Sequence, residues 1–283
     1  MTDLSRRKFL GSAAAVALTA PLFPHLSIAN EAPASGKIKF KLGLASYTTR
    51  KLSRAETIAA VKKIGLKYMC FKDVHLPMKA TAEECAAAAA ECRAAGITLY
   101  GCGGVYMKTP EEVKNAFRYA KASGMTTIIG IPQPELLPLI EEKVKETNIA
   151  VAIHNHGPGD KLYPTPESIY ERIKDLDKRI GLCIDVGHTE RYGVDVIESL
   201  KKYGHRLLDL HIKDETEKSE KGQTCVCGEG VLDLPGYIET LKEIGYDRVV
   251  AFEYEADADN PIPGLTKSVE HIRELIKKSA LPS

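Results

Sequence analysis

Histidine and acidic side chains cluster at the ends of four apolar segments in the second half of the chain. The segments cover residues 153–156, 184–188, 210–214 and 252–255. Apolar runs of this length are typical of buried parallel strands, and the carboxyl ends of the strands of a β/α barrel meet at one site. Imidazole nitrogens and carboxylate oxygens are ligands that divalent transition metals take in proteins. These segments therefore predict a metal site, and with it an enzyme.

Strand geometry selects the side chains that can converge, because successive side chains of a strand point to opposite faces. Within 210–214, His211 and Lys213 share one face while Asp214 points to the other. By the same rule Glu253 and Glu255 share a face. The inward face of each strand end therefore carries the groups suited to chemistry.

One ligand from each of four consecutive strands could surround a single ion. A lone histidine at a strand end is more often a hydrogen-bonded structural residue, whereas a buried carboxylate without a partner is costly. A divalent cation would supply that partner to all the carboxylates at once. The predicted ligands are His154, Asp185, His211 and Glu253.

Eight apolar strand candidates alternate with amphipathic helical patterns after residue 36. The strand candidates lie at 41–46, 68–72, 98–102, 126–131, 149–153, 181–184, 207–212 and 248–252. The helical patterns lie at 53–64, 81–95, 109–122, 134–146, 165–176, 194–203, 234–244 and 264–278. Eight strand–helix repeats predict a single closed (β/α)₈ barrel of the α/β class. A doubly wound open sheet is the alternative, but no Gly-x-Gly-x-x-Gly fingerprint follows the first strand.

Composition and charge suit a soluble enzyme with a small-molecule substrate. Hydrophobic residues make up 44% and charged residues 27% of the chain, and the formal net charge is +1. This balance gives no strong attraction to nucleic acid or to an anionic membrane. The seven scattered cysteines predict no disulfide framework, although Cys225 and Cys227 leave open a metal pair or a strained disulfide. The long connection 215–231 is expected at the active face, where such loops are often functional.

The N-terminus predicts export. Residues 5–10, Ser-Arg-Arg-Lys-Phe-Leu, resemble a twin-arginine signal, and an Ala-rich apolar stretch too short to span a bilayer follows at 11–22. We therefore expect a removable signal peptide at 1–30, a linker at 31–36 and a catalytic barrel at 37–283. The expected location is the periplasm, with no membrane attachment after the signal is removed.

The strand-end motifs resemble those of the xylose isomerase-like family, which includes sugar isomerases, sugar-phosphate epimerases and family-2 endonucleases. The resemblance covers about residues 40–280 and is most specific at 183–188, 211–214 and 252–254. It implies that Asp185, His211 and Glu253 bind a divalent metal. The fourth ligand of the family is usually a glutamate at the fifth strand end, where this chain has His154. A set of two nitrogens and two carboxylates suits Mn, Co, Fe or Zn, and water or His156 is the alternative fourth ligand.

Further residues at the strand ends are candidates for catalysis or substrate contact. His188 resembles a family position that contacts substrate, and His156 is a candidate base because an imidazole titrates near neutral pH. Lys213 and Glu255 could act as acid or base, or could instead pair with and support neighbouring groups. Possible substrate contacts, each of which could equally be an ordinary surface residue, are His75, Tyr106 and Lys108.

The resemblance implies removal of a proton beside a sugar carbonyl. An exported enzyme rarely meets sugar phosphates, and no phosphate-binding glycine-rich motif is evident, so an unphosphorylated sugar or glycoside is expected. Exported proteins similar to this chain include 3-keto-glycoside lyases, which makes β-elimination the first expectation and isomerisation or epimerisation the second. A non-catalytic sugar-binding barrel is favoured only by the missing fifth-strand glutamate. A nuclease is opposed by the near-neutral charge, and the oligomeric state stays open.

Overall fold

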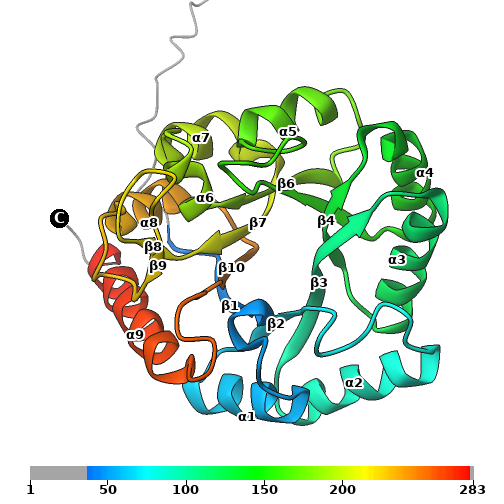
Figure 1. The fold of residues 1–283 in the computed structure, drawn as a ribbon, viewed down its shortest axis with the longest axis horizontal. Helices are drawn as coiled ribbons and strands as arrows, with labels where there is room; N and C mark the ends of the chain where they lie inside the picture. Colours follow the sequence, from blue (N-terminus) through cyan, green and yellow to red (C-terminus); the bar gives the residue numbers. More distant parts are fainter. Residues whose placement is uncertain (1–36, 281–283) are drawn as a thin grey trace, which may run out of the picture. The chain divides into compact units, whose positions relative to one another are not determined.

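The computed structural model describes residues 37–280, and eight parallel strands in it close into a barrel (Figure 1). The expected signal peptide and linker lie outside the described residues. Each strand pairs with the next in the chain, and the last pairs with the first, as predicted for a (β/α)₈ barrel. The strands are β1 Lys41–Ala45, β2 Tyr68–Phe71, β3 Thr98–Met107, β4 Thr127–Pro132, β5 Ala150–His154, β6 Ile180–Asp185, β7 Leu207–Ile212 and β10 Val249–Phe252.

Helices surround the barrel (Figure 1). Four of them begin with a capping box. In each, a serine or threonine hydroxyl accepts the backbone N–H of the residue three positions later, and the side chain of that residue accepts the backbone N–H of the serine or threonine. The caps at Thr109 and Thr165 are followed by proline, whose fixed φ suits the first helical turn. The helices are α1 Arg54–Ile64, α2 Ala82–Ala94, α3 Pro110–Ala122, α4 Leu137–Thr147, α5 Pro166–Ile173, α7 Val196–Tyr203, α8 Leu234–Glu243 and α9 Ile262–Ser279.

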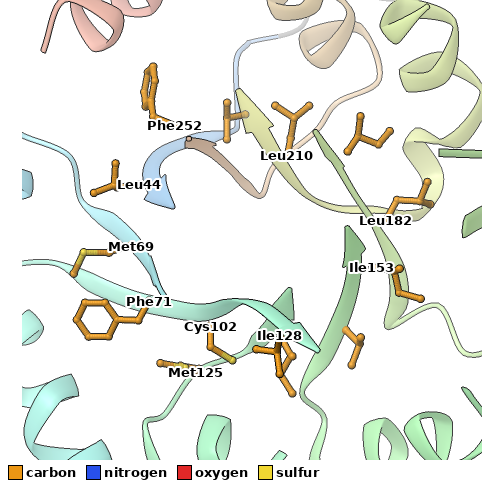
Figure 2. Packing of buried hydrophobic residues seen from close by; sticks show 14 of the residues in the cluster. Leu44, Met69, Phe71, Cys102, Met125, Ile128, Ile153, Leu182, Leu210 and Phe252 are labelled. Carbon is orange, nitrogen blue, oxygen red and sulfur yellow. The ribbon is translucent and has the colours of Figure 1, made fainter. Parts of the chain in front are cut away.

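The core is divided by strand alternation. Side chains such as Leu210, Ile153 and Leu182 leave the barrel wall and pack in the layer between strands and helices (Figure 2). A separate buried cluster fills the barrel interior, with Ala152 and Cys183 among its members. Each fully buried aliphatic side chain contributes about 1.5–3 kcal/mol. Since Leu210 faces outward, its neighbour His211 faces the barrel interior.

Several local features differ from the sequence-based expectation. Strand β3 continues to Met107 across a bulge between Cys102 and Val105, so Tyr106 lies within the strand instead of following it. A short helix, α6 Val186–Arg191, starts directly after β6 and contains His188, in a segment for which no helical pattern was predicted. A 3₁₀ turn, η1 Ser46–Thr49, follows β1.

The long connection after β7 has some order of its own. Its first residues pair as an antiparallel hairpin, β8 Asp214–Glu215 with β9 Thr224–Cys225. Asp214 fixes this segment, because its carboxylate accepts backbone N–H groups of Gly228, Gly230 and Leu232. All seven cysteines are free thiols in the part of the chain that the structure describes, so the Cys225–Cys227 disulfide does not form. Within residues 37–280, no helix has the length and apolar character needed to cross a membrane.

Candidate metal centre

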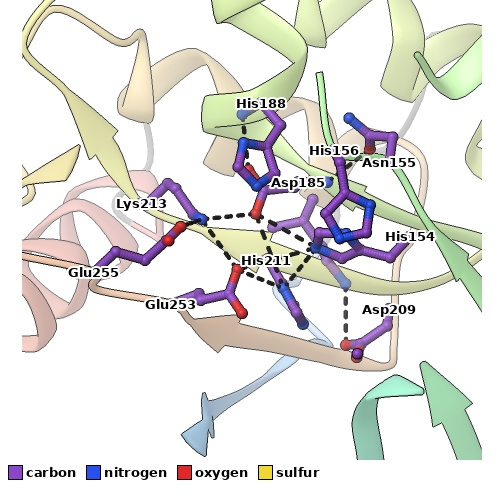
Figure 3. Close-up of polar contacts among 12 residues, drawn as sticks. His154, Asn155, His156, Asp185, His188, Asp209, His211, Lys213, Glu253 and Glu255 are labelled. Carbon is purple, nitrogen blue, oxygen red and sulfur yellow. Dashed lines mark hydrogen bonds and ion pairs between the residues drawn. The ribbon is translucent and has the colours of Figure 1, made fainter. Parts of the chain in front are cut away.

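Four neighbouring strands deliver the predicted ligands to one end of the barrel (Figure 3). His154 ends β5 and Asp185 ends β6, while Glu253 directly follows β10. His211 lies opposite Asp185 in the β6–β7 register. Three of the four side chains are buried and that of Glu253 is nearly so, which means that solvent does little to stabilise their charges.

The ligand atoms are close enough to share one ion. Nε2 of His154 lies 3.0 Å from Nδ1 of His211, and that Nδ1 lies 3.1 Å from Oε2 of Glu253. The Asp185 Oδ2 is 3.6 Å from His154 Nε2 and 3.9 Å from His211 Nδ1, and the distance from His154 Nε2 to Glu253 Oε2 is 4.0 Å. Atoms that bind zinc at about 2.0–2.2 Å stand no more than roughly 4.4 Å apart. All five separations meet that limit.

The chemistry of the donor set also fits a metal. The buried Oδ2 of Asp185 accepts no hydrogen bond but faces the Lys213 ammonium at 2.9 Å, while its Oδ1 accepts the backbone N–H of His188 at 2.8 Å. One carboxylate oxygen therefore caps α6, and the other can bind an ion beside Lys213. His154, Cys183 and His211 form a second candidate group, but the Cys183 thiol is deeply buried and its pKa is raised well above the usual value by that burial. A thiolate ligand is disfavoured there.

Lys213 places a positive charge beside two of the ligands. Its ammonium is fully buried and lies 2.9 Å from Asp185 Oδ2 and 3.0 Å from Glu253 Oε2, and it also contacts Glu255. Burial lowers the pKa of Lys213, but the three carboxylates outweigh it and hold that pKa well above the usual value. In turn, burial raises the pKa of Asp185 and Glu253, and neighbouring positive charge overrides it and keeps both pKa values well below the usual range. For Asp185 this charge comes from His188 and then Lys213, and for Glu253 it comes from Lys213 and then His211. Both carboxylates are therefore ionised, as ligands must be.

The imidazoles differ in protonation. Burial lowers the pKa of His154 and of His156 to about 4, so both rings are neutral at neutral pH. Burial also lowers the pKa of His211, yet the adjoining Glu253 carboxylate raises it overall to about 9. Without an ion, one proton sits among the facing nitrogens and the carboxylate. A divalent metal would take the place of that proton.

A cavity of about 310 Å³ opens above the ligands. His156, His188, Glu255 and Tyr106 line it together with ligand atoms of the centre. The rings of His156 and His188 have centroids 5.8 Å apart, and Tyr106 stacks on His156 at 6.4 Å. The structure therefore brings these four predicted residues to one place.

Two predicted substrate contacts lie elsewhere. His75 is buried, with Nδ1 2.8 Å from the Ser46 hydroxyl and Nε2 3.1 Å from the Thr57 hydroxyl, so both ring nitrogens are used within the fold. Lys108 is exposed at the end of β3, with its ammonium 5.7 Å from the Tyr106 ring centroid. Neither residue lines the cavity. This arrangement favours a structural role for His75 and a surface position for Lys108.

The cavity also contains residues that the sequence did not single out. Lys72, Ser46 and Tyr47 line it, and the Lys72 ammonium donates to the carbonyl of Gly104 at 3.2 Å. Lys72 could have been found by alternation, because it shares a face with Cys70, which also lines the cavity. Tyr47 reaches the cavity because it lies in the 3₁₀ turn η1, which no local pattern predicted.

A hydrogen bond indicates the tautomer of His188, and the charge of a nearby carboxylate indicates that of His156. Arg191 donates to Nδ1 of His188 at 2.6 Å, and an arginine cannot accept, so the ring hydrogen of neutral His188 lies on Nε2. Nδ1 of His156 lies 3.2 Å from the Asp160 carboxylate, which favours hydrogen on Nδ1 and a free lone pair on Nε2. The cavity thus has one imidazole suited to donate a proton and one suited to accept it.

Comparisons with known proteins agree with the barrel fold. A family model described as xylose isomerase-like TIM barrel matches residues 58–275. The inosose dehydratase of Clostridium perfringens is 28% identical over 149 residues, 46% of this chain and 49% of that protein. The crystal structure of the IOLI protein with a bound zinc atom has a TM-score of 0.72 at 18% identity, over 85% of this chain and 99% of that one.

A third comparison concerns a keto-sugar enzyme. The crystal structure of the 3-keto-D-glucoside 4-epimerase YcjR from E. coli has a TM-score of 0.68 at 16% identity, over 83% of this chain and 100% of that one. At these identities the two structural likenesses establish the fold. The chain spans about half the length, or less, of the first curated relatives that it matches.

Proposed function

Because the chain belongs to the xylose isomerase-like TIM barrel family of sugar isomerase-, epimerase- and dehydratase-like enzymes, we propose that it is a divalent-metal enzyme that removes a proton beside a sugar carbonyl. The observation that carries this proposal is the convergence of four ligand atoms from four strand ends. The zinc atom in the IOLI structure supports the same kind of centre. Mn, Co, Fe and Zn all suit the two nitrogens and two carboxylates.

Each part of the cavity has a task in this chemistry. A cation held by His154, Asp185, His211 and Glu253 would draw electron density from a carbonyl oxygen and so acidify the neighbouring C–H. His156 Nε2 accepts that proton, since its lone pair is free. Nε2–H of His188 donates to an oxygen of the substrate. Lys213 keeps two ligands ionised and in place.

The favoured reaction is β-elimination from a 3-keto-glycoside. The 3-ketone acidifies the C2 hydrogen, and the C2–H bond breaks with its proton going to His156. The electron pair forms a C1–C2 double bond as the C1–O bond breaks, and His188 protonates the leaving oxygen. The closeness of the two imidazoles supports this choice, because it places acceptor and donor near one another. Two proteins similar to this chain are named as an inosose dehydratase and a 3-keto-D-glucoside 4-epimerase, and the second name supports a keto-sugar substrate.

Isomerisation or epimerisation of an unphosphorylated sugar is the second candidate. It begins with the same proton removal, so the ligands alone do not separate the two. An epimerase must handle protons on both faces of the reacting carbon, and Glu255 or Lys72 would have to serve the other face. The N-terminal segment 5–10 supports export by the twin-arginine route to the periplasm, and with it an unphosphorylated substrate.

One experiment tests the proposal. The metal-loaded protein is incubated in deuterated water with 3-keto-glucosides and free ketoses, and its metal content is measured. Release of the alcohol with formation of a 2-hydroxyglycal supports the lyase. Deuterium at C2 without cleavage indicates an isomerase or epimerase. Sugar binding without metal or turnover would leave a non-catalytic barrel and refute the enzyme.

A further inference from the structure

A second hollow, of about 230 Å³, adjoins the metal-centre cavity at the end of β3. Gly103, Gly104 and Tyr106 line both spaces and form the boundary between them. The boundary residues contribute few side-chain atoms of their own, because two of the three are glycines. It arises at the β3 bulge, and bulges commonly redirect a strand next to a functional site.

Glycine is required at the centre of this boundary. Gly104 has a φ of +63°, in the left-handed region that favours glycine. A Cβ there would collide with the Lys72 ammonium, which instead passes over the residue and donates to its carbonyl. A Cβ on Gly103 would lie 3.0 Å from the Cys70 sulfur. The close approach of Lys72 and Cys70 to the boundary therefore depends on these two glycines.

The second hollow combines an apolar wall with polar groups. Tyr106, which is 54% exposed, and Met78 offer apolar surface, while Asp73 offers an exposed carboxylate. The Asn115 amide is already used within the fold, because it donates to the Met78 carbonyl and accepts from Arg118. Among the described residues, the Asp73 carboxylate has no hydrogen-bond or ion-pair partner. An aromatic ring beside a free carboxylate is the kind of surface that binds a hydroxylated ring, because C–H faces pack on the ring while hydroxyls donate to the carboxylate.

We propose that this hollow is a subsite for the C1 substituent of the substrate, and that the substituent is a second sugar ring. The inference rests on the proposed function and specifies its substrate class as a disaccharide-like glycoside. The metal-centre cavity lies at the small end of the range of about 300–1,000 Å³ for ligand pockets, which suits one ring. A second ring attached to the first would extend across the glycine boundary.

The first test measures binding without turnover. Titration calorimetry compares cellobiose with methyl β-glucoside on the full metal-loaded chain. Cellobiose is expected to bind about tenfold more tightly, as a hydrogen bond to a charged group would give. Equal affinities, or no detectable binding of cellobiose, would overturn the subsite.

Two variants test whether the preference for cellobiose over methyl β-glucoside arises in this hollow. Asp73→Ala removes the free acceptor and Met78→Trp fills the hollow, and each is expected to reduce the cellobiose-to-methyl-glucoside affinity ratio by about threefold to tenfold. The matched control is Asp175→Ala, an exposed acid in the α5–β6 connection at the other end of the barrel, which should leave the ratio unchanged. A ratio unaffected by both hollow variants overturns the placement.

Kinetics with the 3-keto forms of the same two sugars separate this inference from the proposed function. Turnover of 3-keto-methyl-glucoside without any advantage for 3-keto-cellobiose would refute the subsite and keep the lyase. Preferential binding of cellobiose without turnover of either keto-sugar would refute the lyase and keep the subsite. A higher kcat/KM for the two-ring substrate that Asp73→Ala reduces supports both.

Discussion

The Lys213 ammonium lies 2.9 Å from Asp185 Oδ2, and neither side chain reaches solvent. The same ammonium contacts Glu253, so one buried cation serves two of the four predicted metal ligands. A buried ion pair is strongly destabilising when one partner is removed, because the other charge stays uncompensated. Lys213 and the proposed divalent metal would therefore stabilise the same carboxylates.

Replacing Lys213 should make the fold depend on metal. Lys213→Met leaves the carboxylates of Asp185 and Glu253 without their cation and is expected to reduce the free energy of unfolding of the metal-free protein by about 3–5 kcal/mol. Added Mn or Zn should raise the melting temperature of this variant more than that of the unmodified protein. Thermal unfolding with and without chelator measures both. Equal metal-induced shifts in the two proteins would contradict the arrangement.

Asp185 has two separable roles, one for each carboxylate oxygen. Asp185→Asn keeps an oxygen that can cap α6 but removes the ligand charge, whereas Asp185→Ala removes both. We expect both variants to lose metal and activity while retaining the fold, and the alanine variant to be less stable than the asparagine variant by about 1 kcal/mol. Metal analysis and denaturant unfolding test this. Full metal content and activity in Asp185→Ala would remove the residue from the centre.

The sequence predicted the barrel, and the meeting of His154, Asp185, His211 and Glu253 at one end of it, because both depend on short-range patterns. Hydrophobic runs located eight strands, and alternation placed His211 inward and Leu210 outward. The position of His154 at a strand end then placed it among the candidate ligands, although the family usually has a glutamate there. Each of these features belongs to a single strand and can therefore be predicted from the local sequence.

Features that depend on tertiary contacts were harder to predict. The helix that carries His188 begins immediately after Asp185, because the aspartate caps it from within the site. His75 looked free at a strand end but is bonded to hydroxyls from residues 46 and 57. The Lys72 side chain can enter the cavity because Gly104 has no Cβ to collide with its ammonium. The pairings of His75 and Lys72 join distant segments and have no local sequence signal, whereas the Asp185 cap has the three-residue spacing of an ordinary N-cap.

Gly104 and Gly124 form a matched pair for testing the glycine boundary. Their φ angles are +63° and +67°, but a Cβ at Gly124 meets nothing within 4 Å. Gly124→Ala should cost about 1–2 kcal/mol from the left-handed backbone alone. Gly104→Ala should cost more, and should also raise KM by displacing Lys72. Equal stability losses and an unchanged KM would refute the close approach of Lys72.

Asp209 should make stability depend on pH. Burial inside the barrel raises the pKa of this carboxyl to about 6, although Tyr100 donates to it at 3.0 Å. Because the folded pKa lies above the unfolded one, the folded state loses stability as the pH rises from about 4 through 6. Asp209→Asn should match the unmodified protein at pH 4 and exceed its free energy of unfolding at pH 8 by on the order of 3 kcal/mol. Denaturant unfolding of both proteins at these two pH values measures the difference in the free energy of unfolding.

The control for Asp209 is an exposed acid. Asp175→Asn should change stability little at either pH, because water already solvates its charge. A gain for Asp209→Asn of the same size at pH 4 and pH 8 would show a packing effect and not a protonation effect.

His188 should matter in proportion to the difficulty of the leaving group. Its Nε2–H is fixed by the bond from Arg191 to Nδ1, and in the proposed lyase reaction this group would protonate the departing oxygen. His188→Gln should lower kcat for an alkyl glycoside by about 10²–10⁴-fold, as loss of a general acid does, but should affect a nitrophenyl glycoside far less, since nitrophenolate leaves without a proton. His156→Gln is the comparison, because loss of the base should slow both substrates alike. If His188→Gln slowed the two glycosides equally, His188 would bind substrate without acting as the acid.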